Sequence, residues 1–223
     1  PTLSRSSAAS DVYKRQSHLS LYRMNDSIFV NFIYCGIALY LVNVYRIDIR
    51  KFICNESNPK ALPGASPASP LLLIASILGA FVLLGMAVIG EYALGLVEAQ
   101  SELVWYSVFA LLAAGIIEEL VFRGYLVVRG KGSVVLVMSC LFFSLVFALV
   151  HGGFWDTENG FSWNFSTQAY FNSSIWFVNS LCFYALRFGP WNPTQSIIPS
   201  IVAHMALNLG VYVVKLSQGF IVF

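Results

Sequence analysis

Long apolar stretches alternate with short polar segments along this chain. Runs with almost no charge occupy about residues 27–45, 71–90, 134–150, 168–186 and 196–214. Each run approaches or reaches the length of about 20 residues that an α-helix needs to cross a bilayer. A sixth run, 103–117, reaches that length only if the helix continues through the polar residues after it. The runs lack the two-residue alternation of barrel strands, so the pattern predicts an all-α, polytopic bundle of about six transmembrane helices.

The composition supports a membrane protein. Hydrophobic residues make up 57% of the chain and charged residues 11%, and the mean hydropathy is +0.71. A soluble domain has too little interior for this share of apolar residues, so we expect an integral multi-pass protein in contact with membrane lipid. The net charge of +2 gives no indication of a nucleic-acid partner, and none is expected. Three cysteines lie inside apolar runs and are expected to be free thiols: Cys35, Cys140 and Cys182.

The first residues differ from the rest of the chain. Residues 1–16 are Ser-rich and non-periodic, and they resemble translated adaptor sequence. We therefore expect residues 1–23 to be a disordered or non-native leader. Residues 24–223 are expected to form a single transmembrane domain, with a motif-bearing core at about 103–210. An adaptor origin would also make the chain a fragment that lacks helices at one end or both.

Charges in the segments between the runs predict the orientation of the bundle. Basic residues gather between the first two runs and after the 103–117 segment, whereas segments 91–102 and 151–167 carry only acids. Alternating helices place all basic segments on one side, which the positive-inside rule assigns to the cytoplasm, with both termini outside. The basic residues are Arg46, Arg50, Lys51, Lys60, Arg129 and Lys131, and the acidic ones are Glu91, Glu98, Glu102, Asp156 and Glu158.

Three ionisable side chains stand at the end of the sixth run: Glu118, Glu119 and Arg123. A charged group at membrane depth costs roughly 2.5–3.5 kcal/mol, so a chain keeps one there chiefly for function. Glu119 and Arg123 are four residues apart and share a helix face, which favours an ion pair. Glu118 points about 100° away from Glu119 and has no local partner. The alternative interpretation is a helix end at the interface, with Arg123 extending towards the basic segment.

Two histidines and an asparagine strengthen the functional interpretation. His151 ends one apolar run, one turn after Phe147, and His204 lies four residues before Asn208 in another. A lone histidine in an apolar helix is commonly a core residue, but several polar groups at membrane depth are better explained by one shared pocket. Counting along the helices at about 1.5 Å per residue puts His151 about 27 Å from the basic side, against about 18 Å for Glu118 and about 12 Å for His204. Convergence therefore requires a strongly tilted helix or one whose start is buried.

This set of side chains supports two kinds of hydrolytic chemistry. A carboxylate and a histidine can deprotonate a water molecule, while a second histidine and a carboxamide can donate hydrogen bonds to an oxyanion. Alternatively, Glu118, His151 and His204 can hold Zn²⁺ and leave one position for water. We favour chemistry without a cofactor, because asparagine is a poor zinc ligand and a good oxyanion donor.

Three motifs follow one another along the chain. They are Glu118-Glu119-x-x-x-Arg123 followed by Gly124, Phe147-x-x-x-His151, and His204-x-x-x-Asn208. Together, over about residues 103–210, they resemble the motifs of the CPBP family, which contains type II CAAX prenyl endopeptidases and bacterial proteins of bacteriocin processing and immunity. The resemblance implies that Glu118 and His151 activate water and that His204 and Asn208 stabilise the oxyanion. The remaining motif residues, Glu119, Arg123 and Phe147, would support the site.

The resemblance also implies a fold and a substrate. The prenyl endopeptidases resemble an eight-helix bundle, so about six spans would be a truncated form of that fold. The implied activity is hydrolysis of a peptide bond in a membrane-associated peptide or protein, prenylated or bacteriocin-like. The implied location is a bacterial plasma membrane.

Two non-catalytic classes of membrane protein stay open on the sequence alone. Buried charges also mark ion pathways, so a transporter-like or sensor bundle is one alternative, although no inverted repeats are visible. An immunity protein that binds a peptide without cutting it is the other. The aromatic residues between 154 and 165 are interpreted as an interfacial belt.

Overall fold

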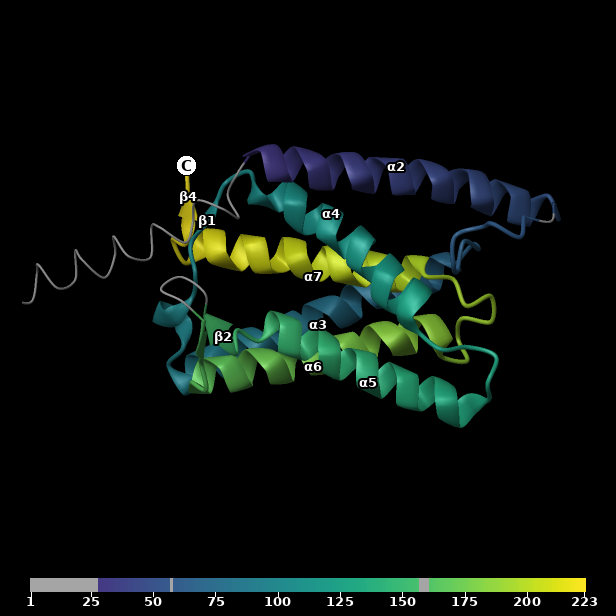
Figure 1. Ribbon diagram of the computed structural model, residues 1–223. Helices are drawn as coiled ribbons and strands as arrows, with labels where there is room; N and C mark the ends of the chain where they lie inside the picture. Colours follow the sequence, from purple (N-terminus) through teal and green to yellow (C-terminus); the bar gives the residue numbers. More distant parts are fainter. Residues whose placement is uncertain (1–27, 57, 157–160) are drawn as a thin grey trace, which may run out of the picture.

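The computed structural model describes residues 28–56, 58–156 and 161–223, so the predicted leader 1–23 lies outside the described residues, as does Glu158. Figure 1 shows one elongated bundle of helices linked by short segments. The helices are α2 (Ile28–Ile53), α3 (Pro70–Leu94), α4 (Ser107–Glu119), α5 (Ser133–His151), α6 (Thr167–Phe188) and α7 (Ile198–Ser217). The predicted all-α bundle of about six helices is therefore confirmed for the described part of the chain.

Four of these helices are long and apolar enough to cross a membrane by length and composition: α2, α3, α5 and α7. α4 has only 13 residues, but a π-helix, η2 (Leu120–Leu126), continues it directly. α6 has 22 residues, a sufficient length, but polar side chains interrupt its apolar surface. α4 packs between α2 and α7, and α6 packs against α5 and α7, so each of these two helices is flanked by longer spans (Figure 1).

The end of α2 differs from the sequence prediction. The helix extends through Arg50 and Lys51, which the sequence pattern assigns to a loop. Basic residues in a last turn stabilise the negative end of the helix dipole. The buried Asp48 ties this end to the following segment, because its carboxylate accepts hydrogen bonds from Asn58 Nδ2 (2.7 Å) and Leu62 N (2.9 Å).

The start of the 103–117 run also differs from the prediction, since it forms a strand instead of a helix. β1 (Leu103–Val104) follows a short 3₁₀ helix, η1 (Val97–Ala99), and pairs in parallel with β4 (Ile221–Val222). Backbone hydrogen bonds of 2.9 Å run from Leu103 N to Phe220 O and from Trp105 N to Val222 O. These bonds satisfy backbone groups that a helix would have paired internally, and α4 therefore starts only at Ser107.

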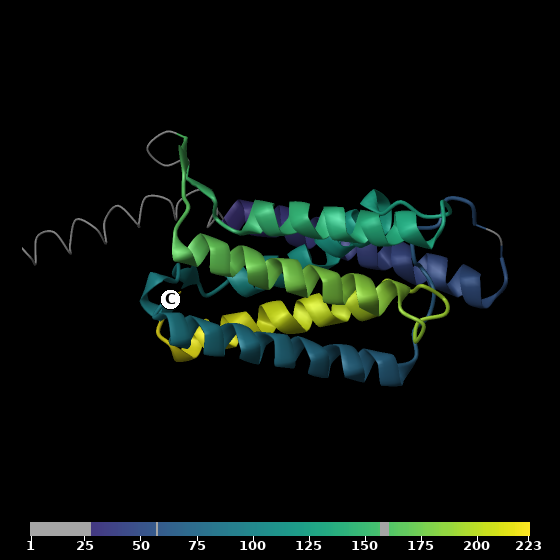
Figure 2. The ribbon, with the colours of Figure 1, turned by 90° about the horizontal axis from the view of Figure 1, so that it is seen from below.

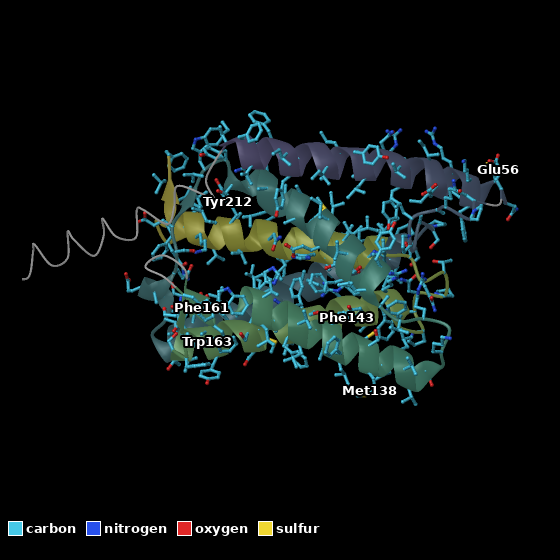
Figure 3. The ribbon with its side chains drawn as sticks, viewed as in Figure 1. Glu56, Met138, Phe143, Phe161, Trp163 and Tyr212 are labelled. Carbon is cyan, nitrogen blue, oxygen red and sulfur yellow. The ribbon has the colours of Figure 1, made fainter. Side chains whose placement is uncertain are left out.

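The bundle has two chemically different ends. A hairpin of β2 (Trp155–Asp156) and β3 (Ser162–Trp163) lies at one end with Phe161 and Trp163, and Glu56 lies at the other (Figure 3). Both aromatic side chains are exposed, as residues of an interfacial belt would be. The loops after α2, η2 and α6 gather at the Glu56 end (Figure 2), so the basic segments share one end as expected. The assignment of that end to the cytoplasm stays a prediction.

α7 lies in the centre of the bundle and contacts α3, α4 and α6. α4 approaches it closely at Gly115, where an added Cβ would lie 3.2 Å from Met205 Cγ and 3.3 Å from Met205 N. Small residues commonly allow such close approach between membrane helices. The contact places the last turn of α4, with its two glutamates, beside His204.

Helix tilt removes the conflict in depth that the residue count predicts for His151. α5 is inclined to α7, and its N-terminal end extends further than that of α7 in both views (Figures 1 and 2). Residues that are the same number of positions from the starts of α5 and α7 therefore lie at different depths in the bundle. This offset allows the last residue of α5 to reach the level of His204.

Candidate active site

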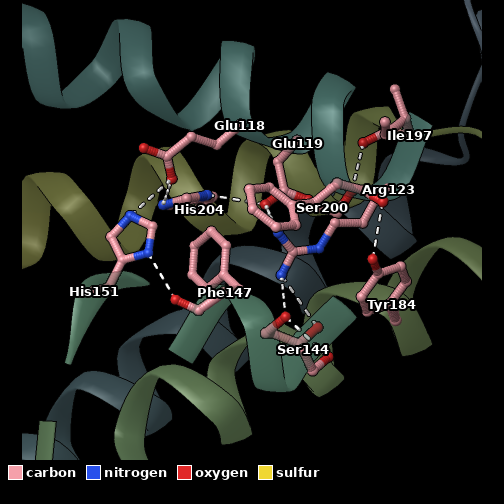
Figure 4. Close-up of polar contacts among 12 residues, drawn as sticks. Glu118, Glu119, Arg123, Ser144, Phe147, His151, Tyr184, Ile197, Ser200 and His204 are labelled. Carbon is pink, nitrogen blue, oxygen red and sulfur yellow. Dashed lines mark hydrogen bonds and ion pairs between the residues drawn. The ribbon is translucent and has the colours of Figure 1, made fainter. Parts of the chain in front are cut away.

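Three side chains from three helices meet inside the bundle (Figure 4). Glu118 belongs to α4, His151 ends α5 and His204 belongs to α7. The Nε2 atoms of His151 and His204 lie 3.7 Å and 3.8 Å from Glu118 Oε2. The His204 side chain is 2% exposed, whereas those of Glu118 and His151 are each 26% exposed, so the cluster is partly accessible. The structure thus brings together three of the four residues predicted as catalytic, and we call them the Glu118 cluster.

Hydrogen bonds on the far side of each ring fix the two imidazoles. His151 Nδ1 lies 2.8 Å from Phe147 O, and His204 Nδ1 lies 2.9 Å from Glu119 Oε1. A carbonyl and a carboxylate are acceptors, so Nδ1 carries a proton in both rings. In the neutral rings both Nε2 atoms are then acceptors, as is the Glu118 carboxylate. Three acceptors around one space are suited to bind a donor such as water.

Glu119 and Arg123 form a buried ion pair behind His204. Glu119 Oε1 lies 3.0 Å from Arg123 Nη1, and both side chains are 0% exposed. Arg123 Nη2 donates to Ser180 Oγ (2.7 Å) and Ser180 O (3.2 Å), and Ser180 Oγ donates to Ser144 Oγ (2.9 Å). The ion pair expected from the four-residue spacing is therefore present. Full burial excludes the alternative in which Arg123 extends to the interface.

Aromatic rings complete the surroundings of the Arg123 guanidinium. Its Cζ lies 4.8 Å from the ring centroid of Phe147, 4.9 Å from that of Tyr184 and 5.3 Å from that of Phe183. Ring faces attract a cation, particularly where water is excluded. They offset the incomplete hydrogen bonding of the guanidinium, because its Nε and Nη1 atoms have no hydrogen-bond partner among the described residues. Nη1 is close to Glu119 Oε1 without being aligned for a hydrogen bond.

The same group of aromatic residues positions the histidines. Phe147 stacks on His151 with ring centroids 4.2 Å apart, and Phe183 stacks on His204 at 5.1 Å. Trp176 lies 5.3 Å from His151. Phe147 was predicted from the sequence as a supporting residue, whereas Phe183, Trp176 and Ser180 on α6 were not. Their spacing at 176, 180 and 183 puts them on one helix face, which is the signal that the sequence offered.

Asn208, the fourth residue predicted as catalytic, lies one turn beyond His204 on α7. It is buried, and its Nδ2 donates a hydrogen bond of 2.8 Å to Leu111 O on α4. No polar contact joins Asn208 to the Glu118 cluster within the described part of the chain. The asparagine therefore ties α7 to α4 one turn from the cluster.

The π-helix η2 places Arg123 against α6. Such segments are rare and frequently occur at functional sites. η2 directly follows Glu119, and Tyr184 OH of α6 donates to Phe122 O in η2 (2.8 Å). The wider turn thus joins the glutamate helix to the helix that carries the serine and aromatic partners of Arg123.

As placed, the Glu118 cluster is wider than a zinc site. Tetrahedral zinc with bonds of about 2.0–2.1 Å holds its ligand atoms about 3.3–3.5 Å apart. The observed separations between each Nε2 and Glu118 Oε2 are 3.7 Å and 3.8 Å. Among the described residues, no group of three or more His, Cys, Asp or Glu side chains is arranged to hold a metal ion. Glu118, His151 and His204 are ligand types that zinc accepts, and as placed their atoms lie a few tenths of an ångström further apart than in a zinc site.

Fold and site together define a polytopic helical membrane protein with a partly accessible Glu–His cluster suited to hydrolysis. The family described as "Type II CAAX prenyl endopeptidase Rce1-like" matches residues 100–210, a range that contains all three motifs. The chain belongs to this family, so the resemblance inferred from the motifs is confirmed. No curated protein and no solved structure matches the chain.

Family membership fixes the broad setting of the site. With four apolar helices, the chain is a multi-pass membrane protein. The family is one of proteases, which supports the protease interpretation of the Glu118 cluster. A membrane protease acts in contact with lipid and on a membrane-associated substrate.

Proposed function

We propose that this protein is an intramembrane endopeptidase that hydrolyses a peptide bond of a membrane-associated substrate. One observation carries the proposal: the Nε2 atoms of His151 and His204 lie 3.7 Å and 3.8 Å from Glu118 Oε2, so the carboxylate and both imidazoles face the same space. Ionisable groups at membrane depth mark function, and a carboxylate beside two imidazoles is equipped for proton transfer.

The attacking water binds between Glu118 and His151. It donates one hydrogen bond to Glu118 Oε2 and one to His151 Nε2, which the Nδ1–H bond to Phe147 O keeps as an acceptor. Glu118 takes one proton as the oxygen forms a bond to the carbonyl carbon of the substrate. The same proton then passes to the leaving amine nitrogen when the C–N bond breaks, which returns Glu118 to its ionised form.

His204 and Asn208 stabilise the oxyanion in this proposal. When the His204 ring also carries a proton at Nε2, the buried Glu119 carboxylate at 2.9 Å stabilises the imidazolium, and Nε2–H donates to the oxyanion. Asn208 projects from the same face of α7, and its bond to Leu111 O fixes the carboxamide. The second amide hydrogen of Asn208 is then the second donor.

The proposed substrate class and location are based on the family resemblance. A prenylated protein is the substrate class that fits the description of a prenyl endopeptidase. A bacteriocin-like peptide is the alternative, which comes from the motif resemblance to the CPBP family alone. A bacterial plasma membrane, with the basic segments of the Glu56 end in the cytoplasm, is the proposed location.

The proposed chemistry uses protein side chains without a metal. The hydrogen bonds at Nδ1 leave Nε2 of both histidines free and are compatible with either chemistry. Water activation by Glu118 and His151 is preferred because Asn208 is a poor zinc ligand and a good oxyanion donor. If zinc binds after side-chain movement, Glu118, His151 and His204 would hold it, and its contribution would be to lower the pKa of a bound water.

Cleavage of a panel of membrane-tethered peptides by the purified, bilayer-reconstituted protein tests the proposal. Glu118→Gln keeps the shape of the side chain but removes the base, and we expect hydrolysis to fall by roughly 10²–10⁴. Glu98→Gln is the matched control, because Glu98 is an exposed glutamate that is not part of the cluster. Equal cleavage by Glu118→Gln and Glu98→Gln, or none by the wild type on any peptide, would favour a non-catalytic binding or transporter-like protein.

A further inference from the structure

α6 carries a stripe of polar residues, and the hydrogen bond from Gln168 Nε2 to Ala99 O (2.8 Å) accounts only for the first of them. Gln168, Asn172 and Asn179 fall on one face of the helix together with Trp176, at spacings of four, four and three residues. A membrane helix keeps carboxamides only where they face protein partners or a cavity. All four line one cavity of about 260 Å³ between α6, α3 and α7.

The cavity has a charged end and an uncharged interior. Its charged lining residues among those described are Glu91 and Lys215, both in last helical turns near the 97–101 segment. Both are held there, since Lys215 Nζ donates to Ser101 O (2.6 Å) and Glu91 Oε2 accepts from Gln100 Nε2 (2.8 Å). The rest of the cavity therefore presents carboxamides from α6 to an apolar wall.

The inner end of the cavity borders the Glu118 cluster. Trp176 lines the cavity and also lies 5.3 Å from His151 and 5.9 Å from Phe147, measured between ring centroids. On α7, Leu207 lines the cavity immediately before Asn208. A chain that lies in the cavity consequently ends beside the residues assigned to hydrolysis.

We propose that this cavity binds an uncharged, extended segment of the peptide substrate. A carboxamide both donates and accepts, so a row of them complements the alternating N–H and C=O groups of a peptide backbone. The apolar wall of α3 and α7 takes the side chains, while an ionised side chain would lose its hydration without gaining a partner. Gln168 and Asn179 are eleven residues apart, about 16 Å along α6, which an extended peptide of about five residues spans.

The inference rests on the proposed function, so its test uses binding rather than hydrolysis. The full chain carrying Glu118→Gln is reconstituted in nanodiscs with an N-acetylated, C-amidated pentapeptide of alanine and leucine around a central benzoylphenylalanine. After irradiation, mass spectrometry maps the cross-links. We expect them on α6 between 168 and 179 and on the facing part of α7. The same peptide with a central lysine should compete at least about tenfold more weakly.

Substitutions in the stripe provide the specific controls. Asn172→Leu combined with Asn179→Leu removes the carboxamides and should lower cross-linking about tenfold, whereas Asn172→Gln keeps a carboxamide and should retain it. Val178→Leu is the matched control, since Val178 is 42% exposed on the outer surface while the adjacent Asn179 is buried. In the active enzyme the Leu pair should raise KM and leave kcat nearly unchanged.

Three results would overturn the inference. They are cross-links confined to other helices, cross-linking that the Leu pair leaves unchanged, and reaction of Asn179→Cys with a charged thiol reagent that the peptide does not protect against. The last result would show that the cavity contains water but does not hold the peptide. Failure of the proposed function is distinguishable, because an inactive wild-type protein can still bind the pentapeptide, and an active enzyme without this binding contradicts the cavity assignment alone.

Discussion

One carboxylate oxygen of Glu119 contacts both Arg123 and His204. Replacing Glu119 by glutamine should therefore change both the stability of the protein and its activity. Oε1 lies 3.0 Å from Arg123 Nη1 and 2.9 Å from His204 Nδ1, and the Glu119 and Arg123 side chains are fully buried. Glu119→Gln leaves Arg123 as a buried cation without a counter-charge. Breaking a buried ion pair in this way costs about 3–5 kcal/mol. For a chain of this size we expect the midpoint of thermal unfolding to fall by about 10 °C.

The same substitution should lower activity through His204. A neutral carboxamide can donate or accept at Nδ1, so it no longer fixes the proton there and no longer stabilises an imidazolium. Loss of a carboxylate that orients a catalytic histidine lowers turnover by about 10⁴ in serine proteases. Arg123 already neutralises part of the Glu119 charge, so the carboxylate stabilises the His204 imidazolium less than in a serine protease. We therefore expect kcat to fall by roughly 10²–10⁴. Peptide cleavage and thermal unfolding of the same detergent-purified sample measure the two effects.

A double substitution separates the ion pair from the histidine contact. Arg123→Met on top of Glu119→Gln removes the unpaired cation and keeps an extended side chain, so stability should partly recover. Activity should stay low, because His204 Nδ1 still lacks a carboxylate. Recovery of both stability and activity in the double variant would refute the assignment and show that Glu119 acts only through Arg123.

Three further predictions concern the other residues of the site. Glu118→Gln should reduce cleavage by roughly 10²–10⁴ with an unchanged unfolding midpoint, since this glutamate is partly exposed and has no buried ion pair; an equal loss of stability would contradict its role as base. Asn208→Ala should lower kcat by roughly 10²–10³ at unchanged KM, and an effect on the unfolding midpoint alone would reduce Asn208 to a tether on Leu111 O. Elemental analysis should find no stoichiometric metal, and one zinc per chain that is lost in both His151→Ala and His204→Ala would overturn the metal-independent chemistry.

The helical framework was predictable from the sequence because lipid imposes a strong constraint. Every backbone group at membrane depth must be paired internally, so an apolar run of sufficient length is almost always a helix. The predicted run 134–150 accordingly matches α5 (Ser133–His151) closely. The prediction failed where water or a distant strand can satisfy the backbone, as at Leu103, whose amide bonds to Phe220 O.

The convergence of Glu118, His151 and His204 was predictable for a related reason, since isolated burial of each polar group would be unfavourable. Glu119 was predicted as a partner of Arg123 from its spacing, whereas for Ser180 and Phe183 the sequence shows only that they share a helix face. Ser180 and Phe183 are ordinary residues in a helical run, and only the packing of α6 against α5 and α7 brings them to the guanidinium. The hydrogen bond from Asn208 to Leu111 O was likewise not predictable, because it depends on how closely α4 approaches α7.

The polar residues of α6 are explained by the groups that they face inside the bundle. Ser180 supports the Arg123–Glu119 pair, Phe183 stacks on His204, and Asn179 faces the cavity next to Trp176. A uniformly apolar helix would cross the membrane more favourably but would leave the guanidinium with fewer acceptors and the cavity without hydrogen-bonding groups. The helix that least resembles a membrane span by composition is therefore the one that connects the buried ion pair, His204 and the proposed peptide site. Substitutions along it should accordingly affect binding at one end and catalysis at the other.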